Sequence, residues 1–403
     1  QYVFDQATIK DLEWILELKE LDFSLREIHR LLSLRRISNF ADSQDILELK
    51  EIYEQPKAVQ DTISPRIKDG EIVLEELEMS EEEIRRIRRI YMIGCGSAYH
   101  VCVSARYVLE ALTRIPVEVD LASEFRYRDP ILEEDSLVIV ISQSGETADT
   151  IAALKEAKSR GARVLGIVNV VGSSIAREAD NVLYTWAGPE ISVATTKAYS
   201  TQLAACYLIS IYFAKIRQTI NEEKYHALVA ELKKLPEKIQ RILGDKERVQ
   251  WFANKFASSK DIFFIGRGLD YGISLEGSLK LKEISYIHSE AYAAGELKHG
   301  TISLIEKGIL VIGIATQPDL YEKMISNMVE VKSRGAYLMG LTCYGNYSME
   351  DTANFTVYVP KTEKYFTNSL AVIPLQLFAY YVAIARGLDV DKPRNLAKSV
   401  TVE

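Results

Sequence analysis

Two parts of the chain contain similar sequence segments in the same order, and the second part follows the first at a constant offset of 172 positions. Three pairs of features keep this offset: residues 90–94 with 262–266, residues 138–140 with 310–312, and Glu124 with Glu296. The two glutamates also stand in similar contexts, Ala-Ser-Glu-Phe and Ala-Gly-Glu-Leu. Because unrelated domains would not hold a single register, the pattern indicates an internal duplication.

Within each copy, short apolar runs alternate with helical patterns. In the first copy the strand-like runs are residues 90–94, 117–120, 137–141 and 164–168, with helical spacing over 99–112 and 149–160. This alternation is typical of a parallel sheet covered by helices on both faces. We therefore predict an α/β fold with two tandem doubly wound parallel-sheet domains of the flavodoxin-like type. The predicted divisions are a helical extension over 1–47, a first domain over 48–245, a second over 246–390 and a C-terminal tail over 391–403.

The charge and the composition of the chain argue against several classes of binding partner and cofactor. The net charge is −8, which disfavours nucleic acid and anionic membrane as partners. No apolar run approaches 18 residues, so no membrane span is expected. The four cysteines form no Cys-x-x-Cys pair, and the five histidines do not cluster with them. We expect a cytoplasmic protein without a metal or another cofactor.

The sharpest local signal is the loop Ser142-Gln143-Ser144-Gly145-Glu146-Thr147. It follows a strand-like run and precedes a helical pattern, and open α/β sheets bind ligands at the carboxyl ends of their strands. Small hydroxylated residues and a glycine allow backbone N–H groups to face an anion, and a helix N-terminus adds positive potential. The loop therefore predicts a phosphate site, and an ordinary serine-rich helix cap is the alternative.

Two more loops of the first copy are expected at the same sheet edge. Residues 94–97 end the first strand, and residues 193–197 are small and hydroxylated before a helix that we expect from Ala198. In the second copy, residues 314–319 replace the hydroxylated loop and look unfit for the same anion cradle. Only the first copy is predicted to bind phosphate in this way.

The second copy carries titratable groups instead. Glu276, Lys280 and Glu283 are spaced i,i+4 and i,i+3, so they share one helix face. A carboxylate held beside an ammonium is a candidate general base, and a solvated charge pair is the alternative. His299 lies in a second polar cluster with Glu296 and Lys298 and is an acid–base candidate. The donor-rich tail 392–399 is either part of the site or a floppy basic terminus.

Residues 48–403 resemble the isomerase half of the glucosamine-6-phosphate synthases, the glutamine–fructose-6-phosphate amidotransferases, which contains two sugar isomerase (SIS) domains. The segments that carry the resemblance are Lys-Glu-Ile-Tyr-Glu-Gln-Pro at 50–56, Ser-Gln-Ser-Gly-Glu-Thr at 142–147, Lys-Leu-Lys-Glu-Ile-Ser-Tyr-Ile-His at 280–288, Ala-Gly-Glu-Leu-Lys-His-Gly at 294–300 and Pro-Arg-Asn-Leu-Ala-Lys-Ser-Val-Thr-Val-Glu at 393–403. The first and last of these segments point to the synthases within the wider superfamily.

The resemblance implies a role for each matching residue. Glu283 would move the proton between C1 and C2, with Lys280 and Glu276 near it. His299 would open the sugar ring from the neighbouring subunit of a homodimer, and Lys398 would contact the open-chain sugar and could form an imine with its carbonyl. The implied phosphate and substrate contacts are Ser142, Gln143, Ser144, Thr147, Cys95, Gly96, Ser97, Val193, Thr195 and Ala397.

The chain departs from the family pattern at several positions. Ala98 and Thr195 stand where the family has serine, and Thr301 replaces a usual proline. The synthases also begin with a glutaminase domain whose first residue is a nucleophilic cysteine, whereas this chain has Gln1 and its first cysteine is Cys95. Residues 2–46 instead resemble part of a MerR-type transcription-regulator head, and a plain helical extension is the alternative.

These observations favour an enzyme that isomerises fructose 6-phosphate and, given ammonia from another source, makes glucosamine 6-phosphate. A sugar-phosphate-sensing regulator with a DNA-binding remnant is a second possibility, but a sensor needs no catalytic base. A deglycase acting on fructosamine phosphates is a third, and the last eleven residues of the chain argue against it.

Overall fold

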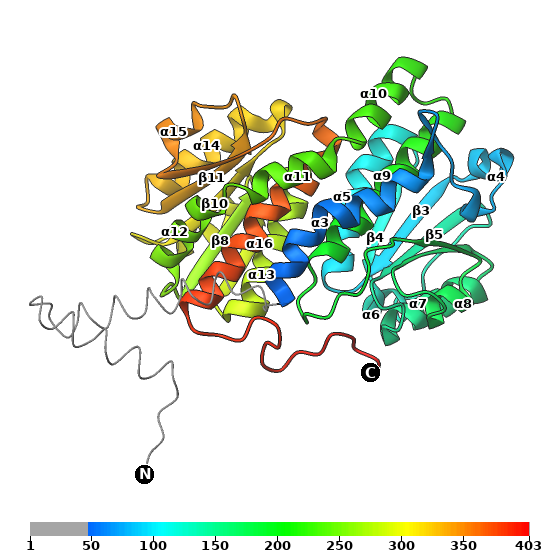
Figure 1. The fold of residues 1–403 in the computed structure, drawn as a ribbon, viewed down its shortest axis with the longest axis horizontal. Helices are drawn as coiled ribbons and strands as arrows, with labels where there is room; N and C mark the ends of the chain where they lie inside the picture. The colour runs from blue at the N-terminus through cyan, green and yellow to red at the C-terminus, as the bar shows by residue number, and fades with distance from the viewer. Residues whose placement is uncertain (1–46, 403) are drawn as a thin grey trace, which may run out of the picture.

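Two five-stranded parallel sheets organise the computed structural model, which describes residues 47–402 (Figure 1). The first sheet has the order β4 (Val117–Leu121), β3 (Arg89–Gly94), β5 (Ser136–Ser142), β6 (Arg163–Val168) and β7 (Asn181–Tyr184). The second has the order β9 (His288–Ala293), β8 (Asp261–Gly266), β10 (Leu310–Ala315), β11 (Tyr337–Cys343) and β12 (Phe355–Val359). All neighbouring strands in both sheets are parallel. The predicted fold class is therefore confirmed.

The duplication is visible in the boundaries of the elements. Strand β3 and the helix α5 (Ser97–Thr113) recur as β8 and α13 (Leu269–Ser285) with every boundary 172 positions later. Between strand and helix, Gly96 has a φ of 54° and Gly268 a φ of 57°. This left-handed conformation favours glycine and turns the chain from the strand into the helix in both copies.

A layer of helices lies between the two sheets (Figure 1). It contains α5, α13, α3 (Leu47–Ile63), α9 (Lys197–Ile216), α11 (Leu235–Leu243) and α16 (Thr367–Ala385). Helix α13 packs against both α5 and α16, so the layer joins the two copies. Within residues 47–402, α16 alone is long and apolar enough to cross a membrane, but 94% of its apolar stretch is buried inside the protein.

The outer face of the first sheet is covered by α6 (Ala122–Phe125), α7 (Ala148–Ser159) and α8 (Ser174–Glu178), and that of the second by α14 (Tyr321–Lys332) and α15 (Met349–Thr352). The other helices pack against the central layer: α4 (Glu81–Arg86) and α10 (Glu222–Leu232) contact α9, and α12 (Lys246–Phe256) contacts α16. Helix α4 begins with a capping box: Ser80 Oγ accepts from the Glu83 N–H, and the Glu83 carboxylate accepts from the Ser80 N–H.

Two local features differ from what the residue patterns indicate. Residues up to 90 show helical patterns and no alternating strand pattern, yet they include the hairpin of β1 (Ile67–Lys68) and β2 (Glu71–Ile72), which turns at Asp69 and Gly70, both with positive φ. Residues 225–243 show one helical pattern, yet they form parts of two helices, because Pro236 has no N–H and clashes with the preceding turn. The predicted domain boundary at 245 falls between α11 and α12 and stays a prediction. The interpretation of residues 2–46 lies outside the described residues.

Candidate functional site

A cavity of about 250 Å³ lies at the carboxyl end of the first sheet. It is lined from three sides: by loops of the first copy, by α13 of the second copy and by the C-terminal tail. The predicted site residues that line it are Cys95, Gly96, Ser97, Ser142, Gln143, Ser144, Thr147, Val193, Thr195, Glu283, Ala397 and Lys398. The structure thus brings together residues that are about 300 positions apart in the sequence.

The floor of the cavity is suited to an anion. Helix α5 begins at the lining residue Ser97 and α7 follows the lining residue Thr147, so two helix N-termini contribute positive potential. Ser142 Oγ lies 3.1 Å from Thr147 Oγ1 and accepts from the Gly145 N–H at 3.0 Å. Gly145 has a φ of +66°, and a Cβ there would lie 2.0 Å from Ser173 Oγ, so only glycine fits this turn. The result is a compact, hydroxyl-rich cradle.

The opposite wall carries a buried charge cluster on α13. Lys280 is 1% exposed, and its Nζ lies 3.6 Å from Glu276 Oε1 and forms an ion pair with Glu283 Oε2. The alternative of a solvated charge pair is therefore wrong. Burial alone would lower the pKa of Lys280, but the carboxylates of Glu283 and Glu276 outweigh it and raise the pKa above its ordinary value. Lys280 is a permanent cation that orients Glu283 at the cavity wall.

Glu276 is fully buried and connects the two copies. It accepts a hydrogen bond from Ser97 Oγ at 2.9 Å, and its other oxygen lies 2.8 Å from His100 Nδ1. Both of these partners stand on α5 of the first copy. Glu276 does not line the cavity, so it acts on the site through Ser97 and Lys280. Sequence reasoning missed His100, because an isolated histidine on a helix carries no distinguishing pattern.

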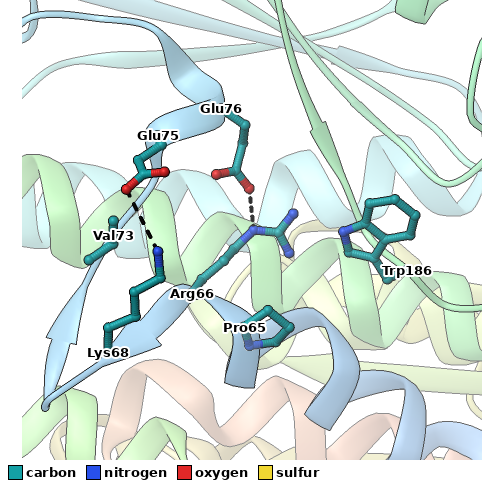
Figure 2. Close-up of a pocket in the computed structure, with 7 residues that line it drawn as sticks. All are labelled: Pro65, Arg66, Lys68, Val73, Glu75, Glu76 and Trp186. Atoms are coloured by element: carbon teal, nitrogen blue, oxygen red, sulfur yellow. Dashed lines mark hydrogen bonds and ion pairs between the residues drawn. The ribbon is translucent and has the colours of Figure 1, made fainter.

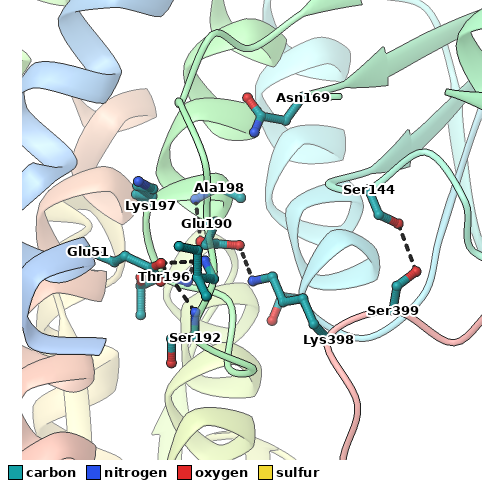
Figure 3. Close-up of polar contacts among 12 residues, drawn as sticks. Glu51, Ser144, Asn169, Glu190, Ser192, Thr196, Lys197, Ala198, Lys398 and Ser399 are labelled. Carbon is teal, nitrogen blue, oxygen red and sulfur yellow. Dashed lines mark hydrogen bonds and ion pairs between the residues drawn. The ribbon is translucent and has the colours of Figure 1, made fainter. Parts of the chain in front are cut away.

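The C-terminal tail closes the cavity. Ser399 Oγ lies 3.1 Å from Ser144 Oγ (Figure 3). The carbonyl of Val400 accepts from the Ala148 N–H at 3.1 Å. Lys398 Nζ lies 2.5 Å from Glu190 Oε2. The alternative of a floppy basic terminus is therefore wrong, because the tail makes specific contacts with the loop that forms the cradle.

Three buried glutamates bind the segment 190–198 around the start of α9, and sequence reasoning did not single them out. Glu190 accepts from the N–H groups of Thr196 and Ala198 at the start of α9, and Glu51 accepts from the Ile191 N–H (Figure 3). Burial raises the pKa of Glu51 to about 7 and that of Glu48 to about 8. Lys398 therefore lines the cavity from a position beside buried acidic residues. A sequence signal was present only for Glu51, which falls within the 50–56 segment.

His299 lies elsewhere. It ends the short helix η3 (Leu297–His299), is exposed and does not line the cavity of its own chain. Its neighbours Glu296 and Lys298 are exposed as well. The prediction that His299 reaches the site of a second subunit is compatible with this exposure and stays a prediction.

A second hollow, of about 150 Å³, lies beside the β1–β2 hairpin and next to Trp186 (Figure 2). It also contains cations, but Arg66 is paired with Glu76 at 2.5 Å and Lys68 with Glu75 at 3.6 Å. Because its own carboxylates neutralise both cations, this hollow does not compete with the first cavity as a phosphate site.

The chain is similar to several known proteins. The SIS domain family matches residues 83–212 and 255–386. A glutamine–fructose-6-phosphate aminotransferase (isomerizing) of Caldanaerobacter subterraneus is 59% identical over 356 residues, covering 88% of this chain and 59% of the relative. One from Clostridium tetani is 53% identical over 409 residues, covering 99% of this chain and 67% of the relative. The C-terminal domain of glucosamine-fructose-6-phosphate aminotransferase from Francisella tularensis has a TM-score of 0.83 at 37% identity, over 87% of this chain and 99% of that one.

Proposed function

The chain belongs to the SIS domain family, among the relatives of the glutamine–fructose-6-phosphate aminotransferases, and we propose that it isomerises fructose 6-phosphate and aminates it to glucosamine 6-phosphate. One observation carries the proposal: the anion cradle of the first copy faces the Lys280–Glu283 pair of the second across one cavity. A sugar-phosphate isomerase needs two parts: a site that binds the phosphate of the substrate and a group that transfers the proton. The chain spans 59% and 67% of the lengths of the two relatives, so the glutamine-dependent step of the whole protein is outside this proposal.

The phosphate group occupies the cradle in this proposal. Ser142, Gln143, Ser144 and Thr147 hold its oxygens, and the N-termini of α5 and α7 stabilise its charge. The sugar then extends towards α13, past Cys95, Gly96 and Ser97 on one side and past Val193, Thr195 and Ala397 on the other. Ser399 now contacts Ser144, so the tail must exchange this hydrogen bond for one to the ligand.

Glu283 is the proposed base. Its carboxylate takes a proton from C1 of the open-chain ketose and returns it to C2, through an enediol. Lys280 keeps the carboxylate in place and is too buried to exchange partners freely. Glu276 holds Lys280 from the other side and is a positioning residue, because it does not reach the cavity.

Lys398 is placed to act on the sugar carbonyl. Once its Nζ leaves Glu190 and loses a proton, it can condense with the C2 carbonyl to an imine, with release of water. Ammonia then displaces Lys398 at C2, and the proton shift to C2 gives the aldose. The net change is fructose 6-phosphate plus ammonia to glucosamine 6-phosphate plus water, which needs no redox cofactor.

The proposal includes a cytoplasmic homodimer in which His299 opens the sugar ring in the partner's cavity. The support is its exposed position outside the cavity of its own chain. Heterodimers of Glu283→Gln and His299→Ala chains contain one site with neither change. Proven heterodimers without any activity would count against a shared site.

The decisive experiment is incubation of the protein with fructose 6-phosphate, with and without ammonium. Isomerisation alone gives glucose 6-phosphate, and amination gives glucosamine 6-phosphate, so the products distinguish the two steps. Binding without turnover in either condition would favour the sugar-phosphate-sensing regulator instead.

A further inference from the structure

The second copy holds a buried carboxylate at the carboxyl end of its sheet. Asp270 is 2% exposed, and one of its oxygens accepts from the Thr316 N–H at 2.8 Å and from the Gln317 N–H at 3.3 Å. Its other oxygen accepts from Thr316 Oγ1 at 2.5 Å. Two successive backbone donors and a hydroxyl around a single anion form the kind of site that binds a carboxylate or a phosphate.

The register of the sheets shows which part of the first copy this site matches. Ile93 pairs with Val140 in the first sheet, and Ile265 pairs with Gly313 in the second. At this strand the second copy is therefore offset by 173 positions, one more than the 172 that matched residues 138–140 with 310–312 in the sequence. Gln143 and Ser144 lie three and four residues after Val140, and Thr316 and Gln317 lie three and four residues after Gly313. Gln143 is therefore the counterpart of Thr316, and Ser144 is the counterpart of Gln317. Asp270 itself follows Ala98 by 172 positions. All three first-copy counterparts of this site, Ala98, Gln143 and Ser144, line the cavity.

We propose that the second copy has kept an anion cradle and that the Asp270 carboxylate takes the place in it that a ligand's anion takes in the first copy. We propose further that this internal carboxylate positions α13 for catalysis. The first two parts stand on geometry alone, and the third rests on the proposed function. The expectation that residues 314–319 are unfit for the phosphate cradle of the first copy stays a prediction. It was drawn from side chains, whereas two of the donors to Asp270 are backbone N–H groups.

The cradle fixes the helix that carries the catalytic groups. Asp270 lies in the first turn of α13, and Glu283 lies in the last part of the same helix. Gln317, which donates its N–H to Asp270, also donates from Nε2 to Thr367 Oγ1 at 2.8 Å at the start of α16. The cradle thus ties α13 to both β10 and α16. Asp270 is a positioning residue, because it touches neither the cavity nor the Lys280–Glu283 pair.

The first test asks whether the cradle binds a separate anion once Asp270 is truncated. Asp270→Ala removes one carboxylate, and formate is the smallest carboxylate able to replace it. We expect formate to raise the melting temperature of Asp270→Ala by about 2 °C or more beyond its effect on the wild type, with sodium chloride at equal ionic strength as the reference. Asp270→Asn fills the space and is expected to gain nothing from formate. Asp319→Ala, which removes an exposed carboxylate of the same loop, is the matched control.

Equal formate effects on the wild type and on Asp270→Ala would overturn the cradle. This measurement needs no catalytic activity, so it stands even if the wild type does not isomerise fructose 6-phosphate. Failure of the proposed function and failure of the cradle are therefore distinguishable.

The second test asks whether the anion positions α13, and it also serves if Asp270→Ala gives no folded protein. Asp270→Asn keeps the shape but places an N–H₂ group against donors. We expect kcat for isomerisation to fall about tenfold or more while KM stays within about twofold, because the first cradle is unchanged. Formate should restore kcat in Asp270→Ala and not in Asp270→Asn. An Asp270→Asn protein with wild-type kcat would overturn the positioning role.

Discussion

His100 Nδ1 lies 2.8 Å from Glu276 Oε2, and this hydrogen bond joins α5 of the first copy to α13 of the second. The offset of 172 positions relates His100 to Gly272 and Glu276 to Ser104. These two counterparts also meet, because a Cβ on Gly272 would lie 2.8 Å from Ser104 Oγ. The two copies of this helix, α5 and α13, therefore contact each other twice through the same pair of equivalent positions. Of the two contacts, only the one between His100 and Glu276 is a hydrogen bond to a carboxylate. The Glu276 carboxylate also accepts a hydrogen bond from Ser97 at the cavity.

His100→Ala is expected to lower the free energy of unfolding by about 1.5–3 kcal/mol, because a buried carboxylate loses one of its donors. Urea denaturation followed by circular dichroism measures this loss. His288→Ala is the matched control: His288 Nδ1 lies 2.8 Å from Asp261 Oδ1, but its side chain is 61% exposed. The control should lose no more than about 1 kcal/mol. Equal losses in the two variants would contradict the importance of burial.

Ser144→Ala combined with Thr147→Ala is expected to weaken fructose 6-phosphate binding. Each hydroxyl donates to a charged phosphate in the proposed complex, and such a hydrogen bond contributes about 1.5–3 kcal/mol. Calorimetric titration with fructose 6-phosphate measures the loss, with glucose 6-phosphate as a second phosphate-bearing ligand that should lose as much. Unchanged affinity would place the phosphate elsewhere.

The sequence was sufficient to predict the parts that depend on pattern and register. The constant offset between residues 90–94 and 262–266 foretold two like sheets, because a doubly wound domain repeats the same strand order wherever it is copied. The loop 142–147 and the i,i+3 pair Lys280–Glu283 were recognisable because strand ends and helix faces fix where side chains point.

Contacts between distant elements were not predictable in this way. Nothing local distinguishes Asp270 from any other aspartate in the first turn of a helix, and its role appears only when the loop after β10 is placed beside it. Glu48 likewise reads as one acidic residue of an exposed helix start, yet it is 1% exposed, because the loop around Ser192 and the tail around Asp391 cover it. Burial of a single polar residue depends on packing that no short pattern encodes.

Stability is expected to fall as the pH rises from about 4.5 to about 8. Burial raises the pKa of Glu48 from an ordinary 4.5 to about 8, so in this window the folded protein holds a proton that the unfolded chain has released. Glu48→Gln should therefore be more stable than the wild type at pH 8, by an amount on the order of a few kcal/mol, and should flatten the pH dependence. Thermal melts between pH 5 and pH 8.5 measure both effects. The exposed Glu75→Gln variant should keep the wild-type slope.

Glu283→Gln tests the base directly. The amide keeps the shape of the carboxylate and its contact with Lys280, but it cannot accept a proton from C1. Since general acid–base catalysis contributes about 10²–10⁴-fold, isomerisation should slow by that factor while the binding of fructose 6-phosphate persists. Loss of deuterium from C1-labelled substrate, followed by NMR, reports the step itself.

Glu296→Gln is the control for this experiment. Glu296 is exposed and does not line the cavity of its own chain, so its variant should release the label at nearly the wild-type rate. If Glu283→Gln exchanged the label normally and Glu296→Gln did not, the base would be Glu296. Because that carboxylate lies beside His299, it would then have to act in the partner's cavity, and the site would depend on the dimer for both of its acid–base groups.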